Sequence, residues 1–576
     1  MNETIKNATV LGIKIDTQTT RLFLFDIVDG KYALLATSEA TSTHAAPFFD
    51  IREGLFRSID LLQSITGRYL VDDEMNLIIP SMEDGNGIDM ISISYGFLDE
   101  LSIIPAGLLE EVSLTSNLNL LQLTHLAVKD SIQLNDTRSL DEIFTSMQNN
   151  HPDMILLSGG TYNGAIKSVA RLLEIILFCT KHWNPKEKPE IIYAGNSRLI
   201  QKLEEIKVEN QLKIHTTENL RPSLELENLL PAIYCINEVT NKLLTNKIPG
   251  LDFIFDHSVS QPIPFSQAIG TMVNFLSNLY PQKSENVLLI DFNKEIFIVA
   301  GNTDKQTKIV KKKNLLTGDP EQFLEKIELA EISDWTNTEI DSEYLLNYVS
   351  NKAIHPNSIP ENKEDLSIEK SLLKYLFRGI YSEYKNIAGS QQEFIHQILV
   401  TGDYLNPYFS NEELILLLLD AIQPIGITNL FVDQYGIFPI LGSIANDNAI
   451  LPIQLLDSNA ISLLARIFSI PSRTRVGTPI LEVHLEFEDG SKLEETIVKG
   501  SIKKLPATAG HTVRLFVDVV GNIDAKQLLK PYQNGLKVQG GNLGIVFDTR
   551  NRPLILPKTP PERIATLNKW QEELRM

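Results

Sequence analysis

Cysteine is scarce in this sequence: Cys179 and Cys235 are the two present among 576 residues. Both lie in apolar stretches, where a buried and reduced thiol is the usual state. The ten histidines are scattered, without HExxH spacing or a CxxC partner, and there is no GxSxG motif. The sequence therefore lacks the signature of a disulfide scaffold, and it signals no zinc site and no hydrolase elbow.

Basic residues are also too few to balance the acidic ones. Lysine and arginine number 52 against 73 aspartates and glutamates, which gives a net charge of −21. Nucleic acids and anionic membranes attract clustered lysine and arginine, so this balance disfavours both as partners. With 43% hydrophobic and 22% charged residues, the chain is typical of a globular protein with room for about three or four domains.

Long hydrophobic runs are missing. The longest apolar stretches, residues 414–419 and 172–179, are too short to span a bilayer. The opening residues MNETIKNATV lack the apolar core of a signal peptide. We therefore expect a cytoplasmic location.

What the sequence does have is a hairpin pattern at its start, residues 10–29. An apolar run leads to Asp16, a polar turn Thr17-Gln18-Thr19-Thr20 follows, and a second apolar run leaves it. A carboxylate at the end of a strand, followed by hydroxyl groups in the turn, suits a hydrated Mg²⁺ and phosphate oxygens. The alternative is an ordinary hairpin in which Asp16 only shapes the turn.

The same design recurs at residues 286–300, where an apolar run ends at Asp291 and a second one follows the turn. Residues 32–40 and 90–97 read as further strands, and residues 46–65 as a helix. Two such hairpins far apart in the chain indicate an internal duplication.

Residues 118–225 are predicted to form a separate α/β unit. The apolar run 152–157 ends in a glycine-rich turn that contains Gly159, Gly160, Thr161 and Asn163, and an apolar helix follows. Repeated strand-to-helix order predicts a parallel sheet, with this turn at the carboxyl end of a strand. Its N–H groups make it a candidate anion-binding loop; a tight turn without a ligand is the alternative.

Past residue 471 the apolar pattern changes to period two, as in antiparallel strands. Residues 480–487 and 513–519 alternate clearly. Residues 544–548 and 553–556 are predicted to be strands that flank a turn, and residues 561–574 a short tail helix.

The first turn resembles the first phosphate loop of the actin/Hsp70/sugar-kinase superfamily, whose pattern is roughly Asp-x-Gly-Ser/Thr-x-Thr-Lys. Asp16, Thr17, Thr19, Thr20 and Arg21 fall in that frame, but Gln18 stands where the pattern has glycine. Glycine allows backbone to approach phosphate closely, so the departure weakens the site.

The superfamily's second phosphate loop, Asp-x-Gly-Gly-x-Thr-Thr-Asp, is altered further. Asp291 remains, but Asn293, Lys294 and Glu295 replace the glycines and the residue after them, and Glu295 would repel a triphosphate. Of the Gly-Gly turn that lies against adenosine in such proteins, Gly402 alone is left. The resemblance implies a degenerate nucleotide site made of Asp16, Thr17, Thr19, Thr20, Asp291, Lys294 and Gly402, with Asp16 and Asp291 as Mg²⁺ ligands.

The order of motifs resembles a narrower group, the glutamate mutase L (MutL) family of actin-like proteins associated with cobalamin-dependent glutamate mutase (methylaspartate mutase). The motifs that carry this resemblance are residues 152–161, 194–196, 217–222, 351–360, 420–428, 433–442 and, as in long members with an added β-domain, 540–554. It implies an α/β, actin-like (ribonuclease H-like) duplicated fold with an inserted parallel α/β unit and a C-terminal antiparallel β-domain. The expected divisions are 1–117 (first part of domain I), 118–225 (inserted unit), 226–470 (remaining core, domain II) and 471–576 (β-domain with tail helix).

For function, the resemblance implies an accessory protein, and the altered loops favour a non-catalytic scaffold with weak or lost ATP binding. The alternatives are a Mg-ATP-dependent reactivating ATPase for a cobalamin-dependent mutase, and an actin-like assembly subunit. Mg-ATP is the cofactor implied, and a protein, such as a mutase subunit, is the partner expected. We assign no catalytic residue and expect at most weak ATPase activity.

Overall fold

The computed structural model describes residues 8–575 apart from 98, 163, 280–285, 304–305, 315, 317–319, 357, 390–393, 406–408, 459 and 525. The chain divides into two compact units. The first contains Met1–Ala268 and Pro439–Leu451, and the second contains Ile269–Phe438 and Pro452–Met576. Each unit is described by itself.

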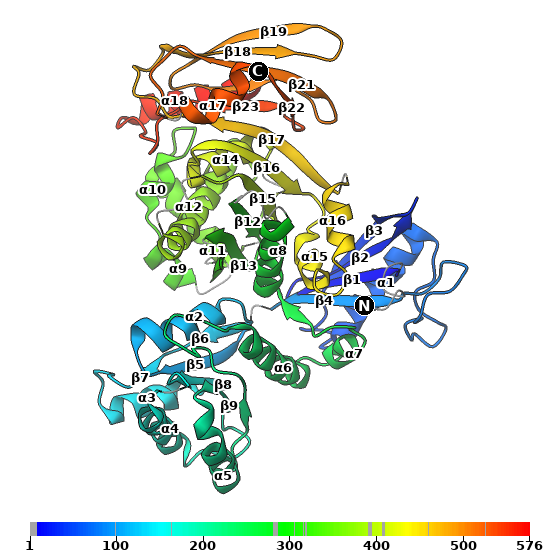
Figure 1. Ribbon diagram of the computed structural model, residues 1–576, viewed down its shortest axis with the longest axis vertical. Helices are drawn as coiled ribbons and strands as arrows, with labels where there is room; N and C mark the ends of the chain where they lie inside the picture. Colours follow the sequence, from blue (N-terminus) through cyan, green and yellow to red (C-terminus); the bar gives the residue numbers. More distant parts are fainter. Residues whose placement is uncertain are drawn as a thin grey trace. The chain divides into compact units, whose positions relative to one another are not determined.

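The first sheet of the first unit is built on the opening hairpin. Its strand order is β11-β4-β1-β2-β3, with β1 antiparallel to β2 and parallel to β4. Helix α1 is capped by Asp50, whose side chain accepts the N–H of Arg52, and it packs its apolar face on this sheet (Figure 1). The bounds are β1 Val10–Asp16, β2 Thr19–Val28, β3 Lys31–Thr41, α1 Ile51–Thr66, β4 Met90–Gly96 and β11 Ile263–Pro264.

The second sheet of this unit has the order β10-β9-β8-β5-β6, with β7 beside β5. All its pairings are parallel, and β8 pairs with β9 throughout, which confirms the predicted parallel arrangement. Strand β5 lies in the middle of this sheet, although the sequence analysis placed its residues in the preceding domain. The bounds are β5 Leu101–Gly107, β6 Leu126–Val128, β7 Ile132–Gln133, β8 Met154–Gly159, β9 Glu190–Gly195 and β10 Ile214–Thr216.

Helices fill the crossovers of this sheet and the chain that follows it. A capping box at Ser139 and Glu142 begins α3, and α4 buries its apolar face in the core formed with β8 and β9. After β10, residues 217–229 contain no helix, and α6 begins at Leu230. The bounds are α2 Thr115–Leu121, α3 Leu140–Asn150, α4 Ile166–Thr180, α5 Ile200–Asn210, α6 Leu230–Lys247 and α7 Leu251–Asp256; α8, Phe265–Leu279, begins in this unit.

The second unit repeats the strand order of the first sheet. Its order β14-β13-β12-β15-β16 corresponds strand for strand to β3-β2-β1-β4-β11, with the same antiparallel and parallel pairings. Asp16, the last residue of β1, and Asp291, the residue before the last of β12, therefore lie near the turn-side ends of corresponding strands. This duplicated order confirms the predicted actin-like α/β fold. The bounds are β12 Val287–Phe292, β13 Ile296–Thr303, β14 Gln306–Lys313, β15 Gln397–Thr401 and β16 Gly426–Asp433.

The long helix α12 is the main cover of this sheet. It packs against β13, β14 and α14, and its inward side chains belong to the largest apolar core (Figure 1). The bounds are α9 Pro320–Lys326, α10 Leu329–Asp334, α11 Ser342–Ile354, α12 Lys363–Ala388 and α14 Asn411–Ile422. Helices α15 (Phe438–Ile444) and α16 (Ile450–Leu456) follow β16.

The sheet of the second unit does not end at β16. It continues through β17 (Ile461–Ser469), β23 (Ile545–Asp548) and β20 (Ile502–Leu505) to eight strands. Strand β23 is therefore part of this larger sheet, parallel to β17, instead of belonging to a separate antiparallel one. The predicted strand at residues 553–556 is wrong. The N–H of Leu554 donates to the side-chain Oε1 of Gln423, and not to the backbone of a neighbouring strand.

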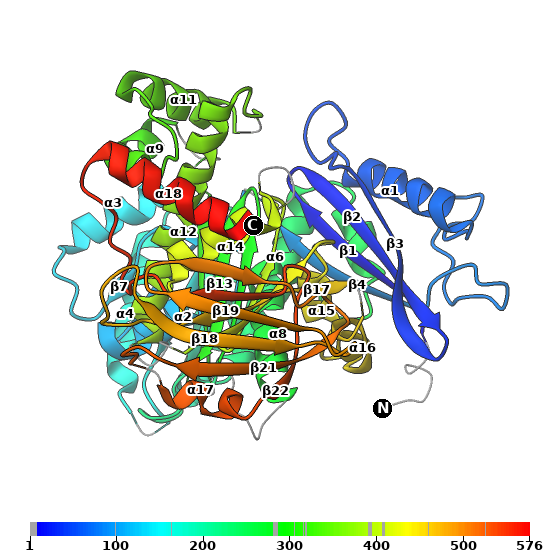
Figure 2. The same cartoon turned by 90° about the horizontal axis from the view of Figure 1, so that it is seen from above.

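A separate antiparallel sheet, β19-β18-β21-β22, is present at the C-terminus as predicted (Figure 2). Its apolar face packs on Phe468 of β17 and Phe547 of β23. Helix α18 contacts α14 and β20. The bounds are β18 Pro479–Glu486, β19 Lys492–Val498, β21 Thr512–Val519, α17 Lys526–Gln533, β22 Leu536–Gln539 and α18 Pro560–Arg575.

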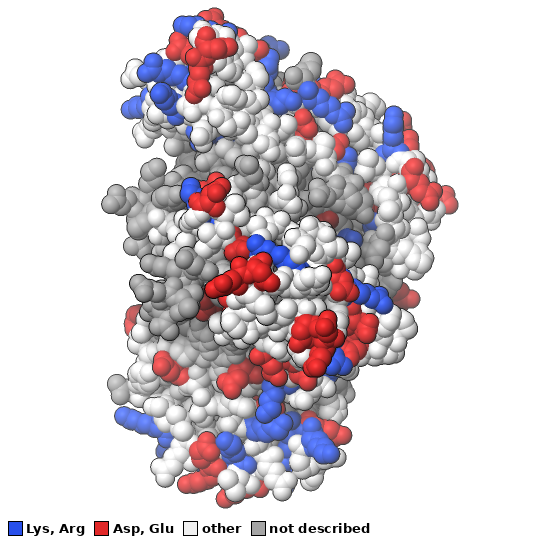
Figure 3. Space-filling view, turned by 90° about the vertical axis from the view of Figure 1, so that its right-hand side faces the viewer, with Lys and Arg blue, Asp and Glu red and all other residues white. Residues whose placement is uncertain are grey.

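Acidic and basic side chains are interspersed on the face of the molecule shown in Figure 3. Among the described residues, no helix is long and apolar enough to cross a membrane. Within the same residues, no group of three or more His, Cys, Asp or Glu side chains is arranged to hold a metal ion.

Candidate functional site

The turn after β1 is organised by Asp16, which is 3% exposed. Its Oδ1 accepts the N–H groups of Gln18 (2.9 Å) and Thr19 (2.7 Å), and its Oδ2 accepts the Thr19 hydroxyl (3.0 Å). An aspartate that bonds N–H groups two and three residues later forms an Asx-type turn. The N–H groups of Gln18 and Thr19 therefore bond Asp16, and a phosphate that used them would have to displace it.

Other residues of the predicted first phosphate loop are also bonded or buried within the sheet. The Arg21 Nε donates to Glu39 Oε2 of β3 at 2.6 Å, so this cation of the first loop is paired with a carboxylate of a neighbouring strand. Thr20 is fully buried, and Thr17 is half-buried. The structure thus brings Asp16 and Thr19 together, whereas Thr20 lies on the opposite side of β2 from Thr19.

The turn after β12 is filled by protein groups. Asn293 and Glu295 are each 2% exposed, and Asn293 Oδ1 accepts the N–H of Glu295 at 3.0 Å. Asn314, which follows β14, donates from Nδ2 to the carbonyl of Lys294 at 2.8 Å and from its own N–H to the carbonyl of Glu295 at 2.8 Å. Asp291 lies beside this turn and is 1% exposed.

Gly402 closes the same region from β15. Its φ of +118° is in the range that favours glycine, and a Cβ there would lie 2.4 Å from the Phe292 carbonyl carbon. The N–H of Tyr404 donates to the Phe292 carbonyl, and the Tyr404 hydroxyl lies 3.0 Å from Asn314 Nδ2. The glycine that the sequence analysis assigned to a nucleotide contact is thus required for close contact with the protein's own backbone.

An aromatic cluster lies under this turn. The rings of Phe292 and Phe377 are 4.7 Å apart, those of Phe292 and Phe297 5.7 Å, and those of Phe297 and Tyr404 6.1 Å. Sequence reasoning recognised the loss of glycines here, but it did not identify Asn314 and Tyr404, which reach the turn only through the fold.

A buried carboxylate, Asp433, links the ends of β15 and β16. It accepts the Thr401 hydroxyl at 2.9 Å and the N–H groups of Gly436 (2.8 Å) and Phe438 (2.9 Å). Burial raises the pKa of Asp433, and these hydrogen bonds oppose that rise. Its donors are all protein groups, so its role is to fix the two loops beside Gly402.

These contacts test whether Mg-ATP suits the residues present. At the first turn, Asp16 and the Thr19 hydroxyl are oxygen ligands of the kind that hold hydrated Mg²⁺. At the second turn, Glu295 and the side chains over it occupy the space and the N–H groups that a phosphate would need. The residues at the second turn therefore do not fit a triphosphate, and metal binding at the first turn, where Asp16 already accepts three hydrogen bonds, stays a prediction.

In the inserted sheet, the Gly159–Thr161 turn lies at the carboxyl end of β8, as predicted. Gly159 (φ +136°) and Gly160 (φ +73°) are both in conformations that favour glycine. Asn196 Nδ2 donates to the Thr161 carbonyl at 2.7 Å, and Asn219 Nδ2 donates to the Gly160 carbonyl at 2.8 Å. Asn163 lies outside the described residues.

Three motifs that carried the family resemblance, at residues 152–161, 194–196 and 217–222, therefore meet at one edge of this sheet. Arg221 is held there by Ser116 Oγ (2.8 Å) and the Leu224 carbonyl (2.8 Å). The sequence did not identify Asn196 and Asn219 as the side chains that bond the carbonyl groups of the turn. Their positions just after the ends of strands were the feature that could have indicated this role. The arrangement fixes the turn's carbonyl groups, while its use as an anion site stays a prediction.

Comparisons with known proteins give a family for the sequence. The family model described as MutL protein matches residues 10–460, which is most of the chain. No curated protein matches the sequence significantly. Among solved structures, nucleotide-free acetone carboxylase is 10% identical, with 93% of this chain and 87% of that chain covered and a TM-score of 0.33.

Two dehydratase activators are similarly distant. Component A of (R)-2-hydroxyglutaryl-CoA dehydratase from Acidaminococcus fermentans is 9% identical, covers 75% of this chain and 95% of its own, and gives a TM-score of 0.24. The activator of 2-hydroxyisocaproyl-CoA dehydratase from Clostridium difficile, with bound ADPNP, is 8% identical, with coverages of 78% and 98% and a TM-score of 0.28. The fold assignment depends on the strand order, and the family on the sequence match: this chain belongs to the MutL protein family.

Proposed function

We propose that this protein is an actin-fold accessory protein that acts on a protein partner, with ATP binding at its hairpin turns weakened or lost. The observation that carries the proposal is the filled turn after β12, where Glu295 is buried and Asn314 bonds the backbone on both sides of it. Phosphoryl transfer is catalysed mainly by positioning and by stabilisation of charge, so it needs phosphate loops that are open to the nucleotide.

The partner that best fits the MutL family is a subunit of a cobalamin-dependent mutase. Binding to that partner would not need nucleotide chemistry in this chain, because the inserted sheet and the duplicated sheets are held by their own cores. Calorimetric titration of this protein with the purified mutase, without nucleotide, is expected to give a saturable complex. A complex that forms only when Mg-ATP is present would contradict the scaffold proposal.

The second candidate function is a Mg-ATP-dependent ATPase that reactivates such a mutase. It is favoured by one observation, the pairing of Asp16 with the Thr19 hydroxyl at the end of β1. An oxygen pair at this place could hold Mg²⁺ even though the second turn is filled.

A titration with Mg-ATP and a phosphate-release assay separate the two functions. We expect no binding at micromolar concentration and no turnover above background for the wild type. Asp16→Asn removes the carboxylate charge, and Asp29→Asn removes an exposed one from the other end of β2 as a matched control. Micromolar binding with turnover that Asp16→Asn abolishes and Asp29→Asn preserves would establish the ATPase instead.

A further inference from the structure

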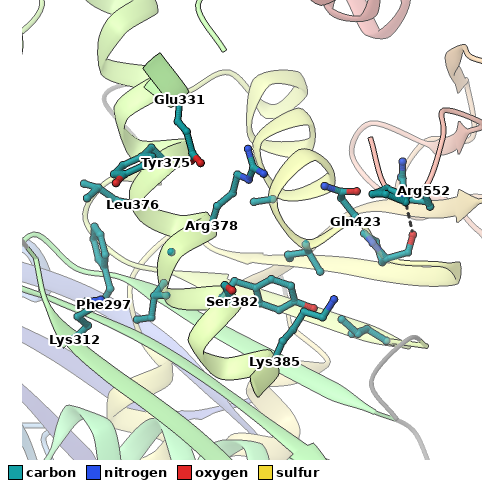
Figure 4. Close-up of a pocket in the computed structure, with 18 of the residues that line it drawn as sticks. Phe297, Lys312, Glu331, Tyr375, Leu376, Arg378, Ser382, Lys385, Gln423 and Arg552 are labelled. Atoms are coloured by element: carbon teal, nitrogen blue, oxygen red, sulfur yellow. Dashed lines mark hydrogen bonds between the residues drawn. The ribbon is translucent and has the colours of Figure 1, made fainter. Parts of the chain in front are cut away.

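The second unit contains a large groove along one side of α12. Its volume is about 1150 Å³, and its walls come from α12, β14, the loop after α14 and the segment at Arg552 (Figure 4). All of these elements belong to the same unit. None of the predicted nucleotide residues lines the groove, although its Phe297 also belongs to the aromatic cluster under the turn after β12.

The floor of the groove is apolar. Six lining side chains are at most 7% exposed and belong to the main core: Phe297, Leu376, Ile380, Tyr381, Ile395 and Ile422. Concave sites for small molecules commonly combine such a floor with a few polar groups that set orientation. Three lining residues of α12, Tyr375, Tyr381 and Ser382, carry hydroxyl groups, which are neutral polar groups.

The rim of the groove is mainly positively charged, whereas the chain as a whole carries a net negative charge. Six lining residues are cationic and one, Glu331, is acidic, in a chain whose net charge is −21. The cations are Lys312, Lys313, Lys326, Arg378, Lys385 and Arg552. Concave surfaces lined by one sign of charge concentrate ligands of the opposite sign.

Some of these cations already have partners. Lys312 pairs with Glu383, and Arg552 donates to Asp548 Oδ2 (2.5 Å) and the Pro424 carbonyl (3.3 Å). By contrast, Arg378 and Lys385 form no ion pair with any described carboxylate. They lie seven residues apart on α12, which is about 10 Å along a helix, and both extend on the side of Gln423 (Figure 4).

A second, smaller cavity in this unit allows the partners of its lining cations to be compared with those of the groove. It has a volume of about 420 Å³ and also borders α12. Its Lys370 and Arg575 both pair with Glu413, and its Lys374 pairs with Asp420 at 2.7 Å. Three of the four cations of this cavity are thus paired with carboxylates, and the fourth, Lys363, lies at the exposed start of α12. In the larger groove, Lys326, Arg378 and Lys385 have no carboxylate partner among the described residues, so they are available to an external anion.

We propose that this groove binds a phosphorylated small molecule that has an apolar or aromatic portion. The phosphate would be held by Arg378 and Lys385, because guanidinium and ammonium groups form their strongest hydrogen bonds with such oxyanions. The apolar portion would lie on the floor beside Ile380 and Ile422. An acidic peptide is disfavoured because Arg378 and Lys385 lie two turns apart on one helix, over an apolar floor, instead of along an extended polar track.

Phenyl phosphate is the probe, because it combines one phosphate with one ring. Calorimetric titration of the full chain without Mg²⁺ is expected to give saturable binding with a dissociation constant below about 1 mM. Inorganic phosphate is expected to bind at least tenfold more weakly because it leaves the floor uncovered. A hexaglutamate peptide tests the alternative occupant and is expected not to bind.

Two variants and a matched control locate the binding. In Arg378→Gln/Lys385→Gln, phenyl phosphate should bind at least tenfold more weakly. Arg171→Gln/Lys202→Gln makes the same charge change at exposed helix positions of the other unit and should leave binding unchanged. Arg378 also lies over the Trp335 ring (5.3 Å), so Lys385→Gln alone, at an exposed position, serves as the variant that leaves packing intact. It should weaken binding at least threefold.

Three results would overturn the proposal: no saturable binding of phenyl phosphate, equal affinity in wild type and in both groove variants, or tighter binding of hexaglutamate. The same variants distinguish binding in the groove from binding at the hairpin turns. ATP binding that is lost in Arg378→Gln/Lys385→Gln but kept in Asp16→Asn would belong to the groove, and it would not revive the ATPase function.

Discussion

At the scale of single residues, Glu190 shows how local charge shapes stability. It begins β9 and is buried, with its carboxylate 2.7 Å from His215 Nε2 and 2.9 Å from Lys213 Nζ, both near or in the neighbouring strand β10. The hydrogen bond from His215, assisted by Lys213, lowers the pKa of Glu190 to about 2, against the effect of burial.

Glu190→Gln is expected to destabilise the protein at neutral pH and to lose that effect in acid. The folded-state pKa lies below the unfolded value of 4.5, so the ionised carboxylate stabilises the fold above pH 4.5. Its contribution, on the order of 3 kcal/mol, declines as the pH falls from about 4.5 to about 2. Urea unfolding of wild type and variant between pH 3 and pH 7 measures the difference.

Glu204→Gln on α5 is the control for this change, since its pair with Lys207 is exposed at 3.5 Å and is expected to be worth less than about 1 kcal/mol. A difference between wild type and Glu190→Gln that stays constant from pH 7 to pH 3 would contradict the assignment.

The sequence allowed the altered turn residues to be recognised, because Gln18, Asn293 and Lys294 stand where a known pattern has glycine. It did not reveal what fills the second turn. Asn314 is about twenty residues away and Tyr404 more than a hundred, and only the pairing of β13 with β14 and of β12 with β15 brings them there. Long-range contacts of this kind leave no local pattern.

At the scale of secondary-structure elements, α11 and α12 are joined by a buried ion pair. Lys352 Nζ lies 2.8 Å from Glu369 Oε1, and the two side chains are 1% and 0% exposed. The Tyr348 hydroxyl donates to Glu369 Oε2 (2.9 Å), and Lys352 also donates to the Ser358 carbonyl (2.7 Å). Burial raises the pKa of Glu369, while Lys352 opposes the rise.

Lys352→Met is expected to destabilise the second unit by about 3 kcal/mol or more, because it leaves a buried carboxylate without its cation. The double variant Lys352→Met/Glu369→Leu should recover at least half of that loss, since the remaining groups are then apolar. Urea unfolding measures both, with Lys363→Met at the exposed start of α12 as the control. A double variant less stable than the single one would show that the pair itself is not the cause.

Elements were predicted correctly from the sequence where the segments they pair with lie nearby in the chain. The hairpins and the β8–β9 crossover were predicted, because their periodicity and short turns identify them. Residues 553–556 were mistaken for a strand because their apolar pattern is the same whether the backbone bonds a strand or, as here, the Gln423 side chain. Likewise, nothing in the sequence of β5 indicates that it pairs with β8.

At the scale of the whole chain, a buried charge network joins the C-terminal region to the preceding core of the second unit. Arg550 is 1% exposed and contacts Asp548 Oδ2 (2.9 Å) and Asp420 Oδ1 of α14 (2.7 Å). Burial alone would raise the pKa of Asp548, but Arg550 and Arg552 outweigh it, so the pKa lies below its usual range. The Arg550 guanidinium also lies 4.7 Å from the Trp570 ring centre.

Arg550→Met is expected to cost about 3 kcal/mol or more, since it leaves Asp420 and Asp548 buried with fewer cations. Because Trp570 stacks on the lost group, intrinsic fluorescence should report the change together with urea unfolding. Arg473→Met is the control: Arg473 is 79% exposed, and its pair with Asp524 is expected to be worth at most about 1 kcal/mol. Equal unfolding midpoints for the two variants would show that the Arg550 network does not stabilise the attachment of the C-terminal region to the preceding core.

The eight-stranded sheet has a consequence for self-association. Unpaired sheet edges template the addition of strands from other chains, and lysines along an edge oppose this. One edge, β14, carries four lysines in the sequence QTKIVKKK. The other, β20, is four residues long, carries Lys503 and Lys504, and has the N–H of Ile502 capped by Glu573 of α18 at 2.9 Å. Both ends of the longest sheet are therefore protected against amyloid-like growth, and the segment beyond residue 460 supplies that protection at one of them.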